Sequence, residues 1–122
     1  MKVLIVDDDP FVVDTYAAAM KNGGFEVECI GDGKQGLDKI SSGGYDIALI
    51  DVVLPSKDGF EILEALRRQG GARPKVILLT NLGRREDVER GRALGADDYI
   101  IKAHVTPQEV MEKIKQALGQ KP

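Results

Sequence analysis

This chain places several aspartates where they could do chemistry together. Asp7, Asp8 and Asp9 form an uninterrupted acidic triplet, and Asp51 directly follows a separate apolar run. Carboxylates that share one cleft repel each other, so such a site either raises the pKa of one carboxyl group or captures a cation. Oxygen ligands favour Mg²⁺ or Mn²⁺, and the sequence offers no set of cysteines and histidines that would indicate zinc or copper.

Two further residues extend this chemistry to phosphoryl transfer. Thr80 follows the apolar run 76–79, and Lys102 follows residues 99–101. In a phosphoryl-transfer site a carboxylate attacks phosphorus, while a metal ion and a lysine ammonium group neutralise the charge on the transferring oxygens. A lone threonine or lysine would indicate little, so this interpretation depends on a fold that brings both to the carboxylates.

The apolar pattern predicts the strands that could do so. Phe25, Val27 and Cys29 alternate with glutamates, which is typical of a half-exposed edge strand. We expect Cys29 to be a small buried hydrophobic residue of that strand. Three continuous apolar runs predict strands buried on both faces, and a shorter segment predicts a fifth strand: residues 3–6, 47–50 and 76–79, then 99–101.

Capping residues, prolines and glycines predict five helices between these strands. Asp9 precedes a proline that suits the first helical position, and Thr106 opens a capping box with Glu109. The charged cluster at 84–87 is expected to be a solvated helix start. The expected helices cover residues 10–22, 33–42, 58–69, 84–94 and 107 to about 119.

The strict alternation of strands and helices indicates an α/β fold with a parallel sheet and right-handed crossovers. In such sheets ligands bind at the carboxyl ends of the strands. The acidic triplet, Asp51, Thr80 and Lys102 all stand at predicted strand ends. The sequence therefore predicts one small pocket that gathers them.

In order and spacing, these residues resemble the receiver domain of response regulators, the CheY-like family. The matching positions are Asp7-Asp8, then Asp51 followed by Pro55 and Gly59, then Thr80 and Lys102; the strongest segments are 46–63 and 95–102. The resemblance covers essentially the whole chain and implies one receiver domain over residues 1–122. It also implies a flavodoxin-like fold, with a five-stranded parallel sheet in the order 2-1-3-4-5 and helices on both faces.

The resemblance implies a metal site for Mg²⁺ or Mn²⁺. Asp8 would be a direct ligand and Asp7 mainly a water-mediated one. Asp51 and the backbone carbonyl of Val53 would supply the other protein oxygens.

The resemblance also implies a signalling switch rather than an enzyme with turnover. Asp51 would accept a phosphoryl group from a sensor histidine kinase, a phosphotransfer protein or a small phosphodonor. Lys102 would hold that group, Thr80 would hydrogen-bond it, and Tyr99 would follow Thr80 inward. The changed partner-binding face would then act on a downstream effector domain or protein, and the chain would catalyse only its own phosphorylation and dephosphorylation.

Two positions depart from the usual pattern of this family. Asn81 stands where a small residue, usually alanine, follows the threonine, and Ala103 stands where proline usually follows the lysine. Without proline we expect a trans Lys102–Ala103 bond, because a cis bond costs about 2.5–4 kcal/mol there. We also expect Val53 and Leu82 to flank the path of the hydrolytic water and to make the phosphorylated form long-lived.

Three alternatives fit the sequence less well than a phosphorylation switch. A flavin protein of the same topology needs a loop that donates N–H groups to phosphate, whereas the loop here is acidic and contains Pro10. A hydrolase of the haloacid dehalogenase type would have Asp-x-Asp after the first strand and a cap insert. A degenerate receiver that binds partners without phosphorylation is disfavoured by the complete set of reacting residues.

Composition narrows the partners and the compartment. The 122 residues carry a formal net charge of -3 with a pI of about 5.2, and no lysine or arginine block stands out. Direct contact of this domain with nucleic acid or an anionic membrane is therefore not expected. No apolar run approaches the ~20 residues of a membrane span, the start turns acidic too soon for a signal peptide, and one cysteine excludes an internal disulfide. We expect a cytoplasmic domain; the sequence leaves open whether it acts alone or within a longer regulator.

Overall fold

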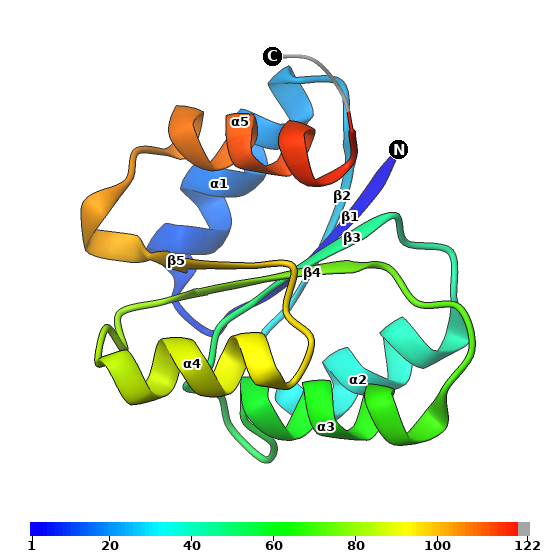
Figure 1. The fold of residues 1–122 in the computed structure, drawn as a ribbon. Helices are drawn as coiled ribbons and strands as arrows, with labels where there is room; N and C mark the ends of the chain where they lie inside the picture. Colours follow the sequence, from blue (N-terminus) through cyan, green and yellow to red (C-terminus); the bar gives the residue numbers. More distant parts are fainter. Residues whose placement is uncertain (120–122) are drawn as a thin grey trace.

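The computed structural model describes residues 1–119. Five parallel strands form one sheet in the order β2-β1-β3-β4-β5, with helices on both faces (Figure 1). The strands are β1 (Lys2–Val6), β2 (Glu26–Ile30), β3 (Ile47–Ile50), β4 (Lys75–Thr80) and β5 (Asp98–Ile101). The predicted α/β class and strand order are confirmed.

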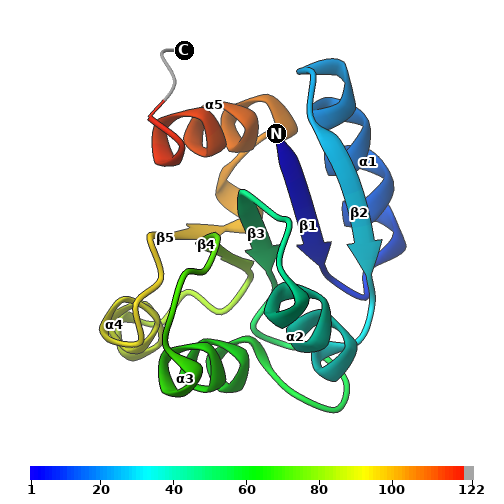
Figure 2. The ribbon, with the colours of Figure 1, turned by 90° about the vertical axis from the view of Figure 1, so that its right-hand side faces the viewer.

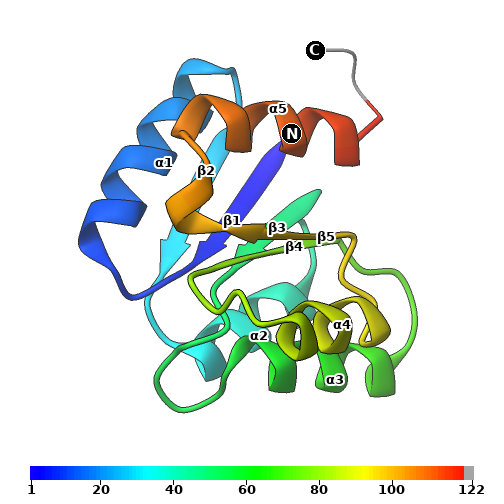
Figure 3. The same ribbon diagram turned by 60° about the vertical axis from the view of Figure 1, so that its left-hand side comes forward.

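The helices cover the sheet as two layers. They are α1 (Pro10–Asn22), α2 (Gly33–Ser42), α3 (Gly59–Gln69), α4 (Arg85–Ala93) and α5 (Pro107–Ala117), and a 3₁₀ turn η1 (Lys102–His104) follows β5. Figures 2 and 3 show α1 and α5 on one face and α2, α3 and α4 on the other. None of the described helices is long and apolar enough to cross a membrane.

The apolar runs of the central strands are buried because both faces of these strands are covered. In β1, Val3 and Ile5 belong to the core beneath α1 and α5, while Leu4 and Val6 belong to the core beneath α2 and α3. All four side chains are at most 1% exposed. This is the reason why the runs show no alternation in the sequence.

Helix starts follow the predicted caps. The Asp9 carboxylate accepts a hydrogen bond from the Phe11 N–H at 3.0 Å. Capping boxes are present at the starts of α3 and α5, between Asp58 and Glu61 and between Thr106 and Glu109. Because these signals are local in the sequence, the predicted helix boundaries lie within about two residues of the observed ones.

The edge strand β2 differs from expectation at one residue. Cys29 is exposed, whereas burial was predicted. A pocket opens beside it, bounded by Pro10, Val13 and Asp14 at the start of α1. The first turns of α1 therefore do not close over this end of the edge strand, although α1 and β2 make contact elsewhere.

A polar network anchors the same edge strand to its neighbours. The Glu28 carboxylate lies 2.8 Å from Lys2 Nζ and accepts a 2.6 Å hydrogen bond from the Tyr45 hydroxyl. These two partners, Lys2 first, lower the pKa of Glu28 to about 2. The network links β2 through charged and polar side chains to β1 and to the segment before β3.

Candidate functional site

The carboxyl ends of β1, β3, β4 and β5 bring the predicted residues together. Figure 2 shows the arrowheads of β1 and β3 at the same end of the sheet. Asp7 directly follows β1, and Asp51 directly follows β3, where its N–H continues the ladder with a 2.9 Å hydrogen bond to the Val6 carbonyl. Thr80 ends β4, and Lys102 directly follows β5. Four neighbouring strands thus supply one cluster of side chains.

Lys102 joins two of the carboxylates. Its Nζ lies 2.7 Å from Asp7 Oδ2 and 2.8 Å from Asp51 Oδ2, and its side chain is only 11% exposed. The sequence predicts one pocket for Lys102, Asp51 and the acidic triplet, but it does not indicate that Lys102 contacts Asp7 as well as Asp51. One ammonium group offsets only one of these two negative charges, and Asp8 adds a third nearby.

Burial and these contacts shift the pKa values of the cluster. Burial raises the pKa of Asp7, and this effect exceeds the opposing hydrogen bonds from Lys102 and from the Asp9 N–H. Burial alone would lower the pKa of Lys102, but its hydrogen bonds to Asp51 and Asp7 outweigh burial and raise it. Lys102 is therefore held in its charged form beside the carboxylates.

The donor set fits a hard divalent cation. Asp7, Asp8 and Asp51 each offer a carboxylate oxygen, and these oxygens lie within 4.8 Å of one another. Asp8 is exposed while the other two are buried, so the cluster is open to solvent on one side. Mg²⁺ commonly binds one or two carboxylates, keeps several waters and completes its shell with phosphate oxygen. A cation at this cluster would also offset the negative charge that the Lys102 ammonium group does not neutralise.

A pocket of about 290 Å³ opens over Asp51. It is lined by Asp8, Asp9, Asp51, Val53, Thr80, Asn81, Leu82 and Lys102. Thr80 is 1% exposed, and its hydroxyl oxygen accepts from the Leu82 N–H at 3.4 Å. Val53 is 61% exposed at the rim, and its N–H donates to Asp51 Oδ1 at 3.2 Å. Both residues expected beside the water path, Val53 and Leu82, thus line this pocket.

The segment that follows Asp51 is held by close backbone contacts. A Cβ at Gly59 would lie 2.6 Å from the Asp51 carbonyl oxygen, so glycine lets α3 start directly against the end of β3. Ser56 donates to Asp32 Oδ1 at 2.8 Å and accepts from the Lys34 N–H at 3.1 Å. The loop between β3 and α3 is therefore fastened to the start of α2.

Tyr99 lies inside the molecule. Its ring is 8% exposed, and its hydroxyl donates to the Leu82 carbonyl. A Cβ at Gly91 of α4 would lie 2.9 Å from the ring, so Gly91 provides the room that the ring occupies. The Tyr99 side chain thus points inward in this structure.

The start of helix α4 contradicts one expectation. Asp87 is 7% exposed, although the whole 84–87 cluster was expected to be solvated. Arg84 explains the difference, because its guanidinium lies 3.1 Å from the Asp87 carboxylate and offsets its charge. The spacing of three residues between them was the signal available in the sequence.

The predicted trans bond between Lys102 and Ala103 is confirmed, since no cis peptide occurs among the described residues.

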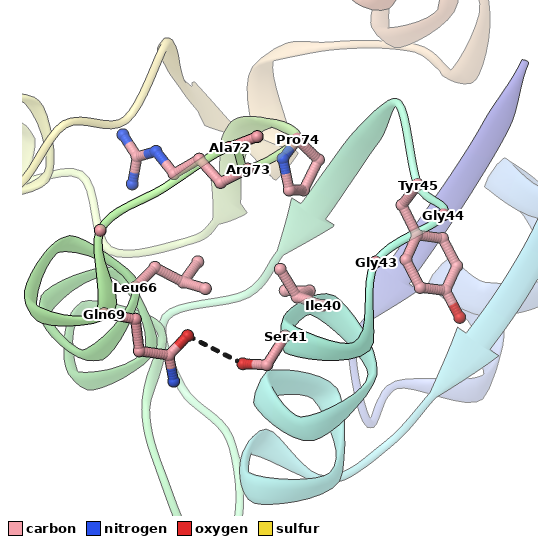
Figure 4. Close-up of a pocket in the computed structure, with 11 residues that line it drawn as sticks. Ile40, Ser41, Gly43, Gly44, Tyr45, Leu66, Gln69, Ala72, Arg73 and Pro74 are labelled. Atoms are coloured by element: carbon pink, nitrogen blue, oxygen red, sulfur yellow. Dashed lines mark hydrogen bonds between the residues drawn. The ribbon is translucent and has the colours of Figure 1, made fainter.

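Another hollow of about 290 Å³ lies at the opposite end of the sheet, between the ends of α2 and α3 (Figure 4). Ser41 donates a 3.0 Å hydrogen bond to Gln69 at its wall, and Ile40 and Leu66 form its floor. None of the described residues that line it carries a carboxylate. The reactive groups gather at the other end.

Comparison with known proteins decides the family. The sequence profile of the response regulator receiver domain matches residues 3–115. The chain belongs to the response regulator receiver family. Members act as signalling switches in two-component systems, and the family binds Mg²⁺ at an acidic pocket. This membership leaves the flavin-binding and hydrolase alternatives without support.

Individual relatives agree with this assignment. The receiver is 40% identical over 101 residues to the transcriptional activator protein PfeR of Pseudomonas aeruginosa, covering 83% of this chain and 32% of that protein. A CheY-like receiver domain protein from Methanospirillum hungatei shares 35% identity over 97% of this chain and 93% of that chain, with a TM-score of 0.88. The BeF₃-activated receiver domain of Klebsiella pneumoniae RstA shares 29% identity over 98% and 100%, also with a TM-score of 0.88.

The receiver spans between 32% and 50% of the length of the first curated relatives it matches. Their names are those of regulators: PfeR is a transcriptional activator protein, and MtrA of Mycolicibacterium smegmatis is a DNA-binding response regulator. The roles that these names give therefore belong to proteins longer than the matched segment.

Proposed function

We propose that this receiver takes a phosphoryl group onto Asp51 in a Mg²⁺-dependent reaction, from a sensor histidine kinase, a phosphotransfer protein or a small phosphodonor. The supporting observation is the Asp51 carboxylate at the base of an open pocket, with Lys102 Nζ 2.8 Å away and two more carboxylates beside it. A degenerate receiver would not need this complete set.

Asp51 is the nucleophile in this proposal. One of its carboxylate oxygens attacks phosphorus, the bond from phosphorus to the donor breaks, and the electron pair stays with the donor nitrogen or oxygen. When bound, Mg²⁺ or Mn²⁺ would be held by Asp8, Asp51, the Val53 carbonyl and, through water, Asp7, and would supply positive charge to the phosphoryl oxygens.

Lys102 and Thr80 stabilise the negative charge of the incoming phosphoryl group. Lys102 already points its ammonium group at the attacking carboxylate, so little reorganisation is needed when the negative charge moves onto the phosphoryl oxygens. Thr80 accepts through its oxygen from Leu82 and keeps its own hydroxyl hydrogen to donate. A small displacement of Thr80 toward the phosphoryl group would strain its contact with Leu82.

In this proposal, Leu82 transmits the structural effect of phosphorylation from Thr80 to α4. Leu82 is tied on one side to Thr80 and on the other to the Tyr99 hydroxyl. In helix α4 only Asp87 and Gly91 are fully buried, and Val88 is partly buried against the core, so this helix has less apolar contact to resist movement than α3. We expect the face formed by α4 and β5 to change and to act on an effector domain or protein. Beryllofluoride at Asp51 should therefore shift amide resonances between residues 84 and 104; unchanged resonances there would refute this route.

We also propose that the receiver domain extends over residues 1–122. The family profile covers 3–115, and α5 ends at Ala117. The last three residues of that prediction lie outside the described residues.

Intact-mass spectrometry tests the proposal directly. After incubation with acetyl phosphate and Mg²⁺, the wild-type chain should gain one phosphoryl group, and removal of Mg²⁺ by a chelator should abolish the gain. Asp51→Asn should gain none, because it keeps the size of the side chain but loses the nucleophile. Asp38→Asn, an exposed position on α2, is the matched control and should behave as wild type. A phosphoryl group on Asp51→Asn would contradict the assignment.

A further inference from the structure

The two positions that depart from the usual family pattern touch each other. Asn81 Oδ1 accepts a hydrogen bond from the Ala103 N–H at 3.2 Å. The donor is a backbone N–H, so the amide atom that faces it has to be the oxygen. A proline at 103 would have no N–H to give, and an alanine at 81 would have no acceptor. Each of the two residues therefore has a partner only because of the other.

This hydrogen bond joins the neighbours of two residues of the site. Asn81 directly follows Thr80 at the end of β4, and Ala103 directly follows Lys102. The ladder between β4 and β5 ends at the pair Thr80 and Ile101. The Asn81 side chain thus continues the connection between these strands beyond the last backbone pairing.

The hydrogen bond from Ala103 to Asn81 also caps the start of η1, which has no cap from the residue before it. The first N–H groups of a helix or 3₁₀ turn have no partner within it, and Ile101, the residue before η1, gives no side-chain cap. Ala103 is the second residue of that turn, and Asn81 accepts its N–H from the neighbouring loop. Lys102 therefore starts from a backbone that is held on both sides, by the strand before it and by Asn81 after it.

We infer that Asn81 is a positioning residue for Lys102. A lysine side chain has a long flexible stem, and ordering it costs conformational entropy. Fixing the backbone at Lys102 and Ala103 limits the directions in which the ammonium group can point, and the observed direction places it 2.8 Å from Asp51. The effect on phosphorylation rests on the proposed function of Asp51, whereas the hydrogen bond itself does not.

Amide exchange tests the hydrogen bond without any phosphorylation. In the full chain, Asn81→Ala should speed solvent exchange of the Ala103 amide by about three- to ten-fold, as expected for one exposed hydrogen bond. Asn81→Asp keeps an acceptor oxygen and should retain the protection. The Val110 amide, bonded to the Thr106 carbonyl in α5, serves as the internal control and should not change. Equal exchange at Ala103 in all three proteins would overturn the inference.

Phosphorylation rates then test whether Asn81 acts through Lys102. Asn81→Ala should slow phosphorylation by acetyl phosphate about three- to ten-fold in the wild-type background. The Lys102→Met background keeps the length of the side-chain stem but has no charge, and its phosphorylation is followed over hours. In this background Asn81→Ala should not slow phosphorylation any further. An equal slowing in both backgrounds, or none in the wild-type background, would overturn the positioning role. Absence of phosphorylation in the wild-type chain would instead refute the proposed function, and the exchange experiment would still judge the hydrogen bond.

Discussion

The lifetime of the phosphorylated chain should depend on Val53 and Leu82. Both line the pocket over Asp51, and neither side chain can hydrogen-bond a water. Hydrolysis requires a water in line with the bond from Asp51 to phosphorus, and orientation of a reactant is a large part of a reaction rate. We therefore predict that the double substitution Val53→Asn and Leu82→Glu speeds hydrolysis.

The magnitude follows from the space and the groups available. The pocket holds about 290 Å³, whereas one water takes a share of about 30 Å³ in the liquid. Two new hydrogen bonds to that water would contribute about 0.5–1.5 kcal/mol each, and ordering two rim side chains costs about 1 kcal/mol or more in return. The balance is a gain of up to about 2 kcal/mol. A gain of about 1.4 kcal/mol within this range would make the decay ten-fold faster.

The assay is a decay time course of the phosphorylated protein after removal of the donor, followed by intact-mass spectrometry. Val53→Ala with Leu82→Ala is the matched control, because it opens the same path without supplying hydrogen bonds to water. We expect this control to decay more slowly than the polar double variant. Half-lives equal to wild type in the polar variant, or a faster wild type, would show that these two side chains do not guard the site.

Two further predictions concern stability. Gly91→Ala should lower the free energy of unfolding in urea titration by about 1 kcal/mol, and by no more than about 2 kcal/mol. The added Cβ would lie 2.8 Å from Leu78 and 2.9 Å from the Tyr99 ring, and overpacking costs about 1–3 kcal/mol against about 1 kcal/mol gained in helix propensity. Unchanged or higher stability would mean that the ring moves away freely. The pKa of Glu28 is lowered from 4.5 to about 2 by its hydrogen bonds, chiefly from Lys2 and then from Tyr45. A carboxyl group whose pKa is lowered by folding stabilises the fold at any pH above its pKa in the unfolded state, and this stabilisation is lost as the pH falls through its pKa in the folded state. Glu28→Gln should therefore be less stable than wild type at pH 7, with the gap closing between about pH 4.5 and 2; a gap that widens on acidification would contradict this.

Local sequence signals carried much of the fold. Continuous apolar runs such as 3–6 and 47–50 predicted fully buried strands because hydrophobic periodicity is encoded residue by residue. The helix starts at Asp9 and Thr106 were equally predictable, since a cap and its partner lie two or three residues apart. The α/β alternation then placed Asp51, Thr80 and Lys102 at one end of the sheet, and their resemblance to the receiver family supplied the strand order.

Other features were decided only by contacts between distant segments. Cys29 follows the alternating pattern of its strand, yet it is exposed because the start of α1 does not cover it. Lys102 reaches Asp7 as well as Asp51, and Asn81 meets Ala103, because β1, β3, β4 and β5 end side by side. A sequence determines which groups are present and the periodicity of the segments that carry them. Which of these groups approach within hydrogen-bonding distance depends on how the segments pack, and that geometry exists only in the tertiary structure.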